Sequence, residues 1–214
     1  MGVTLIEART TGEGWLEVSR AVLEQGAEAV YDGQTTRELA LLTLVVSEPA
    51  SADPIVDELG DPEWLAWMHD NFVVQGEVAE LGDADSYAVL LFDWARTGRD
   101  QIAWVVERLR RDPESRSATV TTFQPLTDEK YIPCISMLDF WLPAGEIELV
   151  VYAHSLDFGK KAYGNLVELA RLQELVALQL GVPVGRLVIH AKSAHVYEPE
   201  WELMARLTGG FAAA

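Results

Sequence analysis

The sequence predicts an α/β fold with a mixed, largely antiparallel sheet, and two neighbouring features carry the prediction. Two strand-like runs, Ile135–Leu142 and Glu146–Tyr152, are separated by a Pro-Ala-Gly segment that is typical of a hairpin turn. Leucine and valine then recur at helical spacing over Leu166–Leu180, which predicts a long amphipathic helix. We expect this helix to pack centrally against the sheet, and residues 1–214 to form one domain.

The predicted strands are apolar on both faces, which is unusual for a sheet that leaves one face in water. Phe140, Trp141 and Val150 all lie in these runs. Their side chains need cover from helices on one face and from a second subunit on the other. We therefore expect a homodimer formed through the sheet.

The N-terminal half contains a helix, a strand and a second, shorter helix. Gly14–Gln25 is expected to be helical because Trp15, Val18 and Val22 form one apolar face. The dense aliphatic run Leu39–Val46 indicates a buried strand. Pro62–Asp70 is expected to form a short helix, with Asp61 as its cap and proline at its first position. The surrounding acidic stretch from residue 53 to 85 is broken by glycine and proline and gives no clearer pattern.

The remaining elements follow from periodicity and from turn residues. Gly98–Arg111 is expected to be helical, with an apolar side and arginines facing out. Strands are expected at Ala118–Phe123 and Arg186–His190. A last helix is expected at Glu198–Leu207, and the small residues of Thr208–Ala214 predict weak structure.

Composition excludes several classes of protein. The formal charge of −18 argues against a nucleic-acid partner, because phosphate contacts dominate that affinity. No apolar run approaches the roughly 20 residues of a membrane span. The four histidines are scattered and give no metal-ligand cluster. The only cysteine cannot form an intrachain disulfide, and the N-terminus lacks a signal-peptide pattern, so we expect a cytoplasmic protein.

Chemically useful side chains follow one another at the ends of the predicted elements in the C-terminal half. Pro133-Cys134 comes directly before the first strand of the hairpin. His154-Ser155-Leu156-Asp157 follows the second strand, and Asn165 lies eight residues after the aspartate. Ala194-His195-Val196-Tyr197 follows the last predicted strand. Sites are often built at the ends of regular elements, so these residues are the candidate site.

The order and spacing of these residues resembles the thymidylate synthase and pyrimidine hydroxymethylase family over about residues 98–197. In its length the chain is similar to the short, archaeal-type members. The family's pattern also shows where this sequence departs from it. Where the family has phosphate-binding arginines, this sequence has Gly33, His154 and Ser117. Where the family has a histidine directly after its cysteine, this sequence has Ile135. Arg37 is a candidate to compensate for Gly33.

The resemblance implies a nucleophile and its neighbours. Cys134 would add to C6 of a pyrimidine, because a thiolate is nucleophilic near neutral pH and can leave again. Asn165 would hydrogen-bond the uracil edge, and Tyr87 would face the nucleotide. Glu58 or Glu63 would hold ordered water as the catalytic glutamate. Taken alone, a cysteine is more often a small core residue, an asparagine a helix cap and a glutamate a solvated surface group.

The resemblance also implies how the nucleotide is held. His154, Ser155 and Arg116 would bind the phosphate, with Arg116 reaching across a dimer. His195 and Tyr197 would hold the ribose hydroxyl. Without the pattern, Arg116 would be a solvated turn residue, and the His-x-Tyr pair would be packing at a strand end.

The implied cofactor is 5,10-methylenetetrahydrofolate or a related reduced pterin, whose ring would be bound by Asp157. The plain alternative for Asp157 is a turn that bonds the backbone near Gly159. The sequence thus predicts a one-carbon transferase that forms a methyl or hydroxymethyl product on a dUMP-like nucleotide. Two alternatives stay open. One is a divergent relative that acts on, or only binds, another pyrimidine or small ligand. The other is a cysteine hydrolase. That activity would need a histidine base oriented by an acid, and no histidine of this sequence stands in that role.

Overall fold

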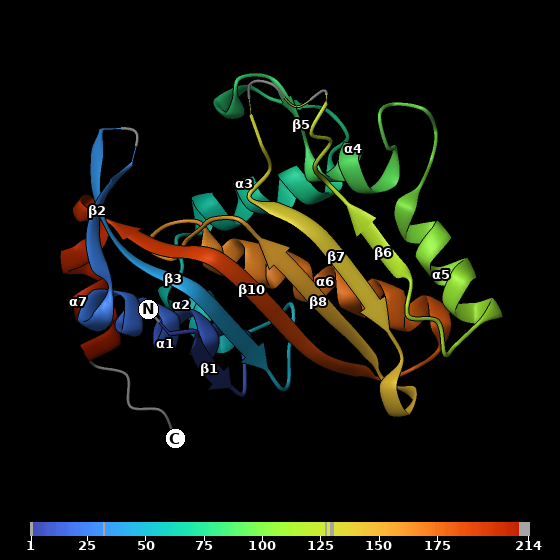
Figure 1. Ribbon diagram of the computed structural model, residues 1–214, viewed down its shortest axis with the longest axis horizontal. Helices are drawn as coiled ribbons and strands as arrows, with labels where there is room; N and C mark the ends of the chain where they lie inside the picture. The colour runs from blue at the N-terminus through green and yellow to red at the C-terminus, as the bar shows by residue number, and fades with distance from the viewer. Residues whose placement is uncertain (1, 32, 127, 129–130, 210–214) are drawn as a thin grey trace.

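The computed structural model describes residues 2–31, 33–126, 128 and 131–209, and these residues form one layer of strands with helices behind it (Figure 1). The main sheet has eight strands in the order β1-β3-β10-β8-β7-β6, with β2 paired to β3 and β9 paired to β10. Its strands are β1 (Thr4–Ala8), β2 (Ala27–Tyr31), β3 (Gln34–Val46), β6 (Ala118–Thr121), β7 (Ile135–Trp141), β8 (Ile147–Ala153), β9 (Leu156–Asp157) and β10 (Val184–Tyr197).

The sheet is mixed and largely antiparallel, which confirms the predicted class. Four pairings are antiparallel: β2 with β3, β3 with β10, β8 with β7 and β7 with β6. Strand β10 runs parallel to β8 and β9, and β1 runs parallel to β3. The predicted hairpin turn is present as a short 3-10 segment, Pro143–Gly145, in which Ala144 and Gly145 both have positive φ.

Seven α-helices surround one face of this sheet in the described part of the chain. They are α1 (Thr11–Gln25), α2 (Pro54–Leu59), α3 (Pro62–Val73), α4 (Tyr87–Phe92), α5 (Gln101–Arg111), α6 (Ala162–Leu180) and α7 (Trp201–Gly209). The acidic stretch also contains a small two-stranded ribbon, β4 (Glu77–Val78) with β5 (Ala84–Asp85).

Helix α6 is the predicted central helix, and it begins four residues earlier than the leucine pattern. Leu166, Leu169, Leu172 and Val176 are fully or nearly fully buried, and the helix contacts β8 and β10 as well as α1, α3 and α5. Asn165 therefore lies inside the first turns of α6, and the cap position is Lys161. Close packing against α3 uses Gly164, where an added Cβ would meet the Met68 side chain at 3.0 Å.

The inner face of the sheet forms the core against these helices. Alternate residues of β7, β8 and β10 point inward, as the period of two requires. They are buried in register: Leu138 and Phe140 on β7, Leu149 and Val151 on β8, Leu187 and Ile189 on β10.

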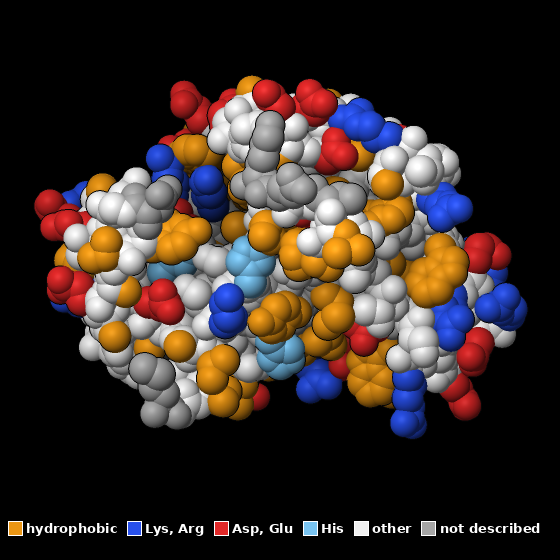
Figure 2. All heavy atoms as spheres, turned by 45° about the horizontal axis from the view of Figure 1, so that its top comes forward, with side chains coloured by type: hydrophobic (Ala, Val, Ile, Leu, Met, Phe, Trp, Pro, Cys, Tyr) orange, Lys and Arg blue, Asp and Glu red, His pale blue; other side chains and the backbone are white. Residues whose placement is uncertain are grey.

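The outer face carries no helix of the described residues, and large apolar side chains are exposed on it. Leu41, Met137, Trp141 and Tyr152 are between 37% and 52% exposed. A space-filling view shows hydrophobic side chains gathered there, with histidine side chains among them (Figure 2).

The pairing of four strands is interrupted at one level, which we call the register break and define by Leu41, Ser136, His154 and Lys192. Leu41 has a positive φ, and the β3–β10 ladder skips its pairing with Lys192. Between β7 and β8 the register shifts between Ile135 and Met137. Strand β8 ends at Ala153 and β9 starts at Leu156. The register break thus crosses the middle of the sheet beside Cys134.

One open edge of the sheet, at β6, is partly covered by a side chain. The Gln101 amide donates to the Thr121 carbonyl at 2.7 Å and accepts from the Thr121 N–H at 3.4 Å. The same amide also donates to the carbonyl of Leu90 at 2.8 Å, which ties α5 to α4.

Candidate functional site

Cys134 lies immediately before β7, at the register break. Its carbonyl accepts a hydrogen bond from the His154 N–H at 3.0 Å, so the strand end that carries the cysteine is pinned to the end of β8. The Tyr87 hydroxyl accepts from the N–H of Ile135 at 3.1 Å. The structure therefore brings Tyr87, from the start of α4, to the residue that follows the cysteine.

The thiol of Cys134 is half-buried, and its electrostatic surroundings are mixed. Burial raises its pKa above the ordinary value. A hydrogen bond from Tyr131 and the ammonium of Lys161 act in the opposite direction, whereas the carboxylate of Asp157 raises the pKa further. Neither Tyr131 nor Lys161 stands out in the sequence, because both reach the thiol only through the fold.

A group of polar side chains, which we call the polar seam, lies along the register break. It consists of Ser136, His154, Ser155, Lys192, Ser193 and His195. His154 Nδ1 lies 3.1 Å from Ser136 Oγ, and His195 Nδ1 lies 3.4 Å from Ser193 Oγ and 3.5 Å from Ser155 Oγ. Two imidazoles and three hydroxyls thus form two hydrogen-bonded groups, and the neighbouring residues His154 and Ser155 bring these groups side by side along the chain.

Both imidazoles of the polar seam favour the neutral form. The pKa of His195, which is 7% exposed, is lowered to about 4, chiefly by burial. The pKa of His154 is lowered by burial first and by the charge of Lys192 second. The strand register supports the proximity of His154 and Lys192. Ala153 pairs with Ala191, and His154 follows Ala153 as Lys192 follows Ala191.

Asp157 is on the short strand β9, beside a second carboxyl group. One carboxylate oxygen of Asp157 accepts from the N–H of Gly159 at 3.0 Å and of Lys160 at 3.2 Å, which is the predicted turn. Burial, and then the charge of Glu200, raise the pKa of Asp157 to about 6. Glu200 Oε2 is buried and has no hydrogen-bond partner among the described residues. No sequence pattern singles out Glu200, which follows the His-x-Tyr pair by three residues.

Asn165 is 5% exposed, and its amide points toward α3. The amide nitrogen donates to the Met68 sulfur at 3.3 Å. Thioether sulfur is a weak acceptor, so this buried amide is only weakly satisfied. Its cap interpretation is excluded, because the helix begins before it.

Two tryptophans and two lysines lie beside Asp157. The rings of Trp64 and Trp67, on α3, meet edge to face at 5.4 Å. Lys160 Nζ lies 4.6 Å from the Trp64 ring, and Lys161 Nζ lies 5.5 Å from the Trp67 ring. This arrangement presents aromatic surface and positive charge next to a buried carboxyl group.

His195 and Tyr197 contact each other at the end of β10, with ring centroids 5.1 Å apart in a T-shaped arrangement. They belong to the same strand as the predicted run Arg186–His190, because β10 extends over fourteen residues. Lys192 and Ser193 interrupt its apolar pattern, which is why the sequence predicts a shorter strand.

Three of the arginine and glutamate candidates lie away from this group. Glu58 and Glu63 are exposed on α2 and α3, and no contact with Cys134 is seen among the described residues. Arg37 donates to the Leu23 carbonyl and lies 4.9 Å over the Trp201 ring, so it is engaged elsewhere. It does not compensate for Gly33 within this arrangement.

Arg116 is exposed in the turn between α5 and β6, near the end of the sheet opposite Cys134. Ala118 pairs with Phe140, six residues along β7 from the cysteine, which corresponds to about 20 Å. Arg116 therefore does not reach the cysteine of its own chain.

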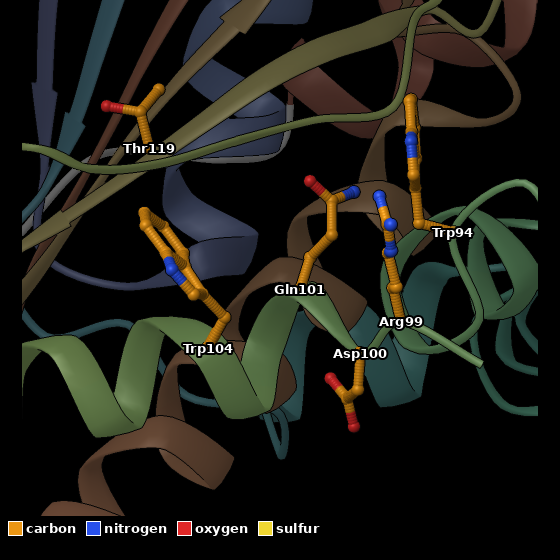
Figure 3. A pocket seen from close by; sticks show the side chains of 6 residues that line it. All are labelled: Trp94, Arg99, Asp100, Gln101, Trp104 and Thr119. Carbon is orange, nitrogen blue, oxygen red and sulfur yellow. The ribbon is translucent and has the colours of Figure 1, made fainter. Parts of the chain in front are cut away.

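A hollow of about 500 Å³ lies beyond the edge strand and not at Cys134. Figure 3 shows its lining: Trp94, Arg99, Asp100, Gln101, Trp104 and Thr119. These residues come from the loop before α5, from α5 itself and from β6. None of them is among the side chains that gather at the cysteine.

Two searches of the described residues gave negative findings. No helix there is both long enough and apolar enough to cross a membrane. No three His, Cys, Asp or Glu side chains there are grouped so as to hold a metal ion.

Sequence comparison decides the family. Residues 51–208 match the family described as thymidylate synthase. The chain belongs to the thymidylate synthase family. Two archaeal proteins named "Putative thymidylate synthase", from Methanosarcina acetivorans and Methanococcoides burtonii, are 30% and 29% identical to it, over 96% of the chain and 95% of each relative. The thymidylate synthase-like fold expected from the sequence is confirmed.

A second kind of relative is similar to about half of the chain. A deoxyuridylate hydroxymethyltransferase from Bacillus phage SP01 is 36% identical over 104 residues, which are 46% of this chain and 27% of that protein. The thymidylate synthase family and this relative both support a one-carbon transferase, as the sequence predicts.

Proposed function

We propose that the protein transfers a one-carbon unit to C5 of a dUMP-like pyrimidine nucleotide through a covalent adduct on Cys134. One observation carries the proposal: the fold gathers Tyr87, His154, Asp157 and Lys161 around the only cysteine of the chain. Cys134, Tyr87 and the segment 154–161 are separate parts of the chain, so the fold is needed to bring them together.

The adduct makes C5 reactive. The Cys134 thiolate attacks C6 of the pyrimidine, the S–C6 bond forms, and the C5=C6 electron pair moves toward C5 and O4. After C5 has gained its new carbon and lost its proton, the S–C6 bond breaks and the thiolate leaves. Tyr131 and Lys161 favour the thiolate, because both stabilise negative charge at sulfur.

The base is proposed to be uracil, bound by Asn165. A carboxamide both donates and accepts, which matches the N3–H and O4 of uracil. The weak bond to the Met68 sulfur leaves the amide available to a ligand. His195 is neutral and buried beside Tyr197, which suits a hydrogen bond to an uncharged ribose hydroxyl.

The described side chains fit a reduced pterin next to the nucleotide. Asp157 and the unpartnered oxygen of Glu200 are acceptors for the amino and N–H groups of a pterin ring. Trp64 and Trp67 offer aromatic faces, and Lys160 and Lys161 offer positive charge for carboxylates. When bound, 5,10-methylenetetrahydrofolate or a related reduced pterin supplies the one-carbon unit and, for a methyl product, the hydride.

We also propose a cytoplasmic homodimer formed through the outer face of the sheet. The exposed Met137, Trp141 and Tyr152 support this interface, since monomeric proteins seldom expose a continuous patch of that kind. The distance of Arg116 from its own cysteine supports a role in the partner's site. The catalytic glutamate is proposed to be Glu58, which would have to act on bound water at the mouth of the site.

Mass spectrometry of the protein with a 5-fluoropyrimidine nucleotide and methylenetetrahydrofolate tests the proposal. A stable ternary adduct on Cys134 is expected, and Cys134→Ser should lose both the adduct and turnover while its fold and nucleotide affinity stay nearly unchanged. The same titrations compare uracil with cytosine nucleotides, and equal affinity would contradict the role of Asn165. Tight reversible binding without an adduct would instead support a divergent relative that only binds its ligand, an alternative to which the raised pKa of Cys134 lends weight.

A further inference from the structure

Lys192 is an unpaired cation in a strongly acidic chain. The sequence has 34 acidic and 16 basic residues, and most described arginines are paired with carboxylates or carbonyls. Lys192 forms no ion pair with a carboxylate of the described residues. The positive charge of Lys192 lowers the pKa of His154, because it disfavours the protonated imidazole.

Lys192 lies at the register break, on the same face of the sheet as the other side chains of the polar seam. Along β10 the buried residues Leu187, Ile189 and Ala191 face the helices, and Lys192 is exposed on the other face. His154 follows the residue that pairs with Ala191, so it lies beside Lys192 on the neighbouring strand. Ser193 is adjacent in sequence.

The groups around Lys192 are hydrogen-bond donors without negative charge. Ser136 Oγ lies 3.1 Å from His154 Nδ1, and Ser193 Oγ lies 3.4 Å from His195 Nδ1. When Nδ1 carries the proton, the imidazole donates to the serine oxygen and leaves the hydroxyl proton free for an anion. A tetrahedral oxyanion with several acceptor oxygens suits such a set of donors around one ammonium.

We propose that Lys192 is the cation that binds the 5′-phosphate of the nucleotide, with the hydroxyls of Ser136 and Ser155 as neutral donors and the neutral imidazole of His154 orienting the Ser136 hydroxyl through Nδ1. This inference rests on the proposed function and names its phosphate subsite. It differs from the sequence-based expectation, in which His154 replaces an arginine as the charged group. His154 is neutral beside Lys192. Gly33 and Ser117, at the other arginine positions of the family, carry no charge. Within one chain, the positive charge of the phosphate subsite therefore comes from Lys192 on β10.

Calorimetric titration of a 2′-deoxyuridine nucleoside and its monophosphate tests the inference. The wild type is expected to bind the monophosphate more tightly. Lys192→Met keeps the aliphatic stem and removes the charge, so this preference should fall about ten- to a hundredfold, which is the loss of one hydrogen bond to a charged group. Affinity for the nucleoside should stay unchanged. Lys192→Arg should retain most of the preference, and Arg206→Met, which removes a positive charge from exposed α7, should leave it intact.

Each other outcome is decisive. An undiminished preference for the monophosphate in Lys192→Met overturns the inference, as does an equal loss of affinity for nucleoside and monophosphate. If the wild type binds neither ligand, the proposed function fails. In that case inorganic phosphate is titrated alone. Phosphate binding that is lost in Lys192→Met and kept in Arg206→Met supports the anion subsite. Phosphate binding that is unchanged in Lys192→Met, or no phosphate binding by the wild type, overturns the anion subsite.

Discussion

The pH behaviour of Cys134 follows from its neighbours and gives the first prediction. Burial raises its pKa, and Lys161 partly offsets this. The rate of alkylation by iodoacetamide follows the thiolate fraction, so it should rise with pH through about 9 without levelling off earlier. Lys161→Met should lower the rate at every pH in this range by removing a stabilising charge. The chain has one cysteine, so the label reports on this site alone.

Lys160→Met is the matched control for this measurement. Its ammonium lies over Trp64, and it is not among the groups that act on the thiol. A rate that levels off at or below pH 8, or equal slowing in the two lysine variants, would contradict the assignment.

Asp157 is expected to lower stability at neutral pH. Its pKa is about 6 in the folded protein and 3.8 ordinarily, so between these values the folded state holds the extra proton. The stability that this group contributes is therefore complete below pH 3.8 and is lost as pH rises to about 6. Asp157→Asn removes the charge and keeps an acceptor for the Gly159 N–H, so it should raise the free energy of unfolding at pH 8 by about 1–3 kcal/mol.

Urea unfolding of this variant at pH 4 and pH 8 gives the measurement. The gain over wild type should appear at pH 8 and vanish near pH 4. Glu200→Gln should give part of the same gain, because Glu200 is the second cause of the raised pKa. A loss of stability at pH 8 in Asp157→Asn would show that the carboxylate is needed for packing.

At the scale of elements, one carboxylate joins the starts of two helices. Asp53 accepts from the N–H groups of Ile55 and Val56 on α2 and, with its other oxygen, from Gly12 of α1 at 2.8 Å. A Cβ on Gly12 would lie 2.4 Å from that carboxylate and 2.6 Å from Ile55 Cβ. Gly12→Ala should therefore separate the two helices and lower the free energy of unfolding by about 2–4 kcal/mol.

Thermal and urea unfolding check this prediction, with Gly76→Ala as the control. A Cβ on Gly76 meets nothing within 4 Å, so that change should stay within about 0.5 kcal/mol. Equal effects of the two substitutions would mean that the link between α1 and α2 does not contribute to stability.

The sequence predicted the strongly periodic elements and lost accuracy where local chemistry or tertiary contacts take over. Helix α1 starts at Thr11, before the expected Gly14, because Thr10 and Glu13 form a capping box. Helix α2 escaped prediction because its six residues span less than two turns. Strand β6 ends at Thr121, two residues early, where Thr122 instead donates its hydroxyl to the Ile135 carbonyl.

The candidate site shows the same division. The fold brings Cys134, Tyr87, His154 and Asp157 close together, and their roles stay predictions. Lys161 and Glu200 were missed, because their contacts depend on how the start of α6 and the turn after β10 lie beside β9. Tyr131 was missed because its hydrogen bond to the thiol depends on how the segment before β7 folds back on itself. Arg37 was interpreted from its loop alone, and the ring of Trp201, more than 160 residues later, engages it instead.

At the scale of the whole molecule, the uncovered face of the sheet predicts the oligomeric state. Sedimentation should show a dimer at micromolar concentration. Met137→Lys together with Tyr152→Glu should give a monomer, because both side chains are exposed on that face and charges there would be desolvated on association. Nucleotide affinity should fall as well, since Arg116 would no longer reach a partner.

Leu178→Lys is the control for that experiment. Leu178 is 80% exposed on α6, away from the uncovered face, so this variant should remain dimeric. A wild type that sediments as a stable monomer would contradict both the interface and the proposed role of Arg116.

The amide of Gln101 affects how the protein can associate with further copies of itself. Strand β6 is four residues long, and Gln101 occupies both outward backbone groups of Thr121, so an incoming strand cannot pair with this residue. Growth by strand addition has no natural end, whereas a two-fold pairing of faces uses up the same surface on both copies. Gln101 therefore hinders strand addition at this point of the β6 edge, whereas the uncovered face leaves the pairing of faces open as a route of self-association.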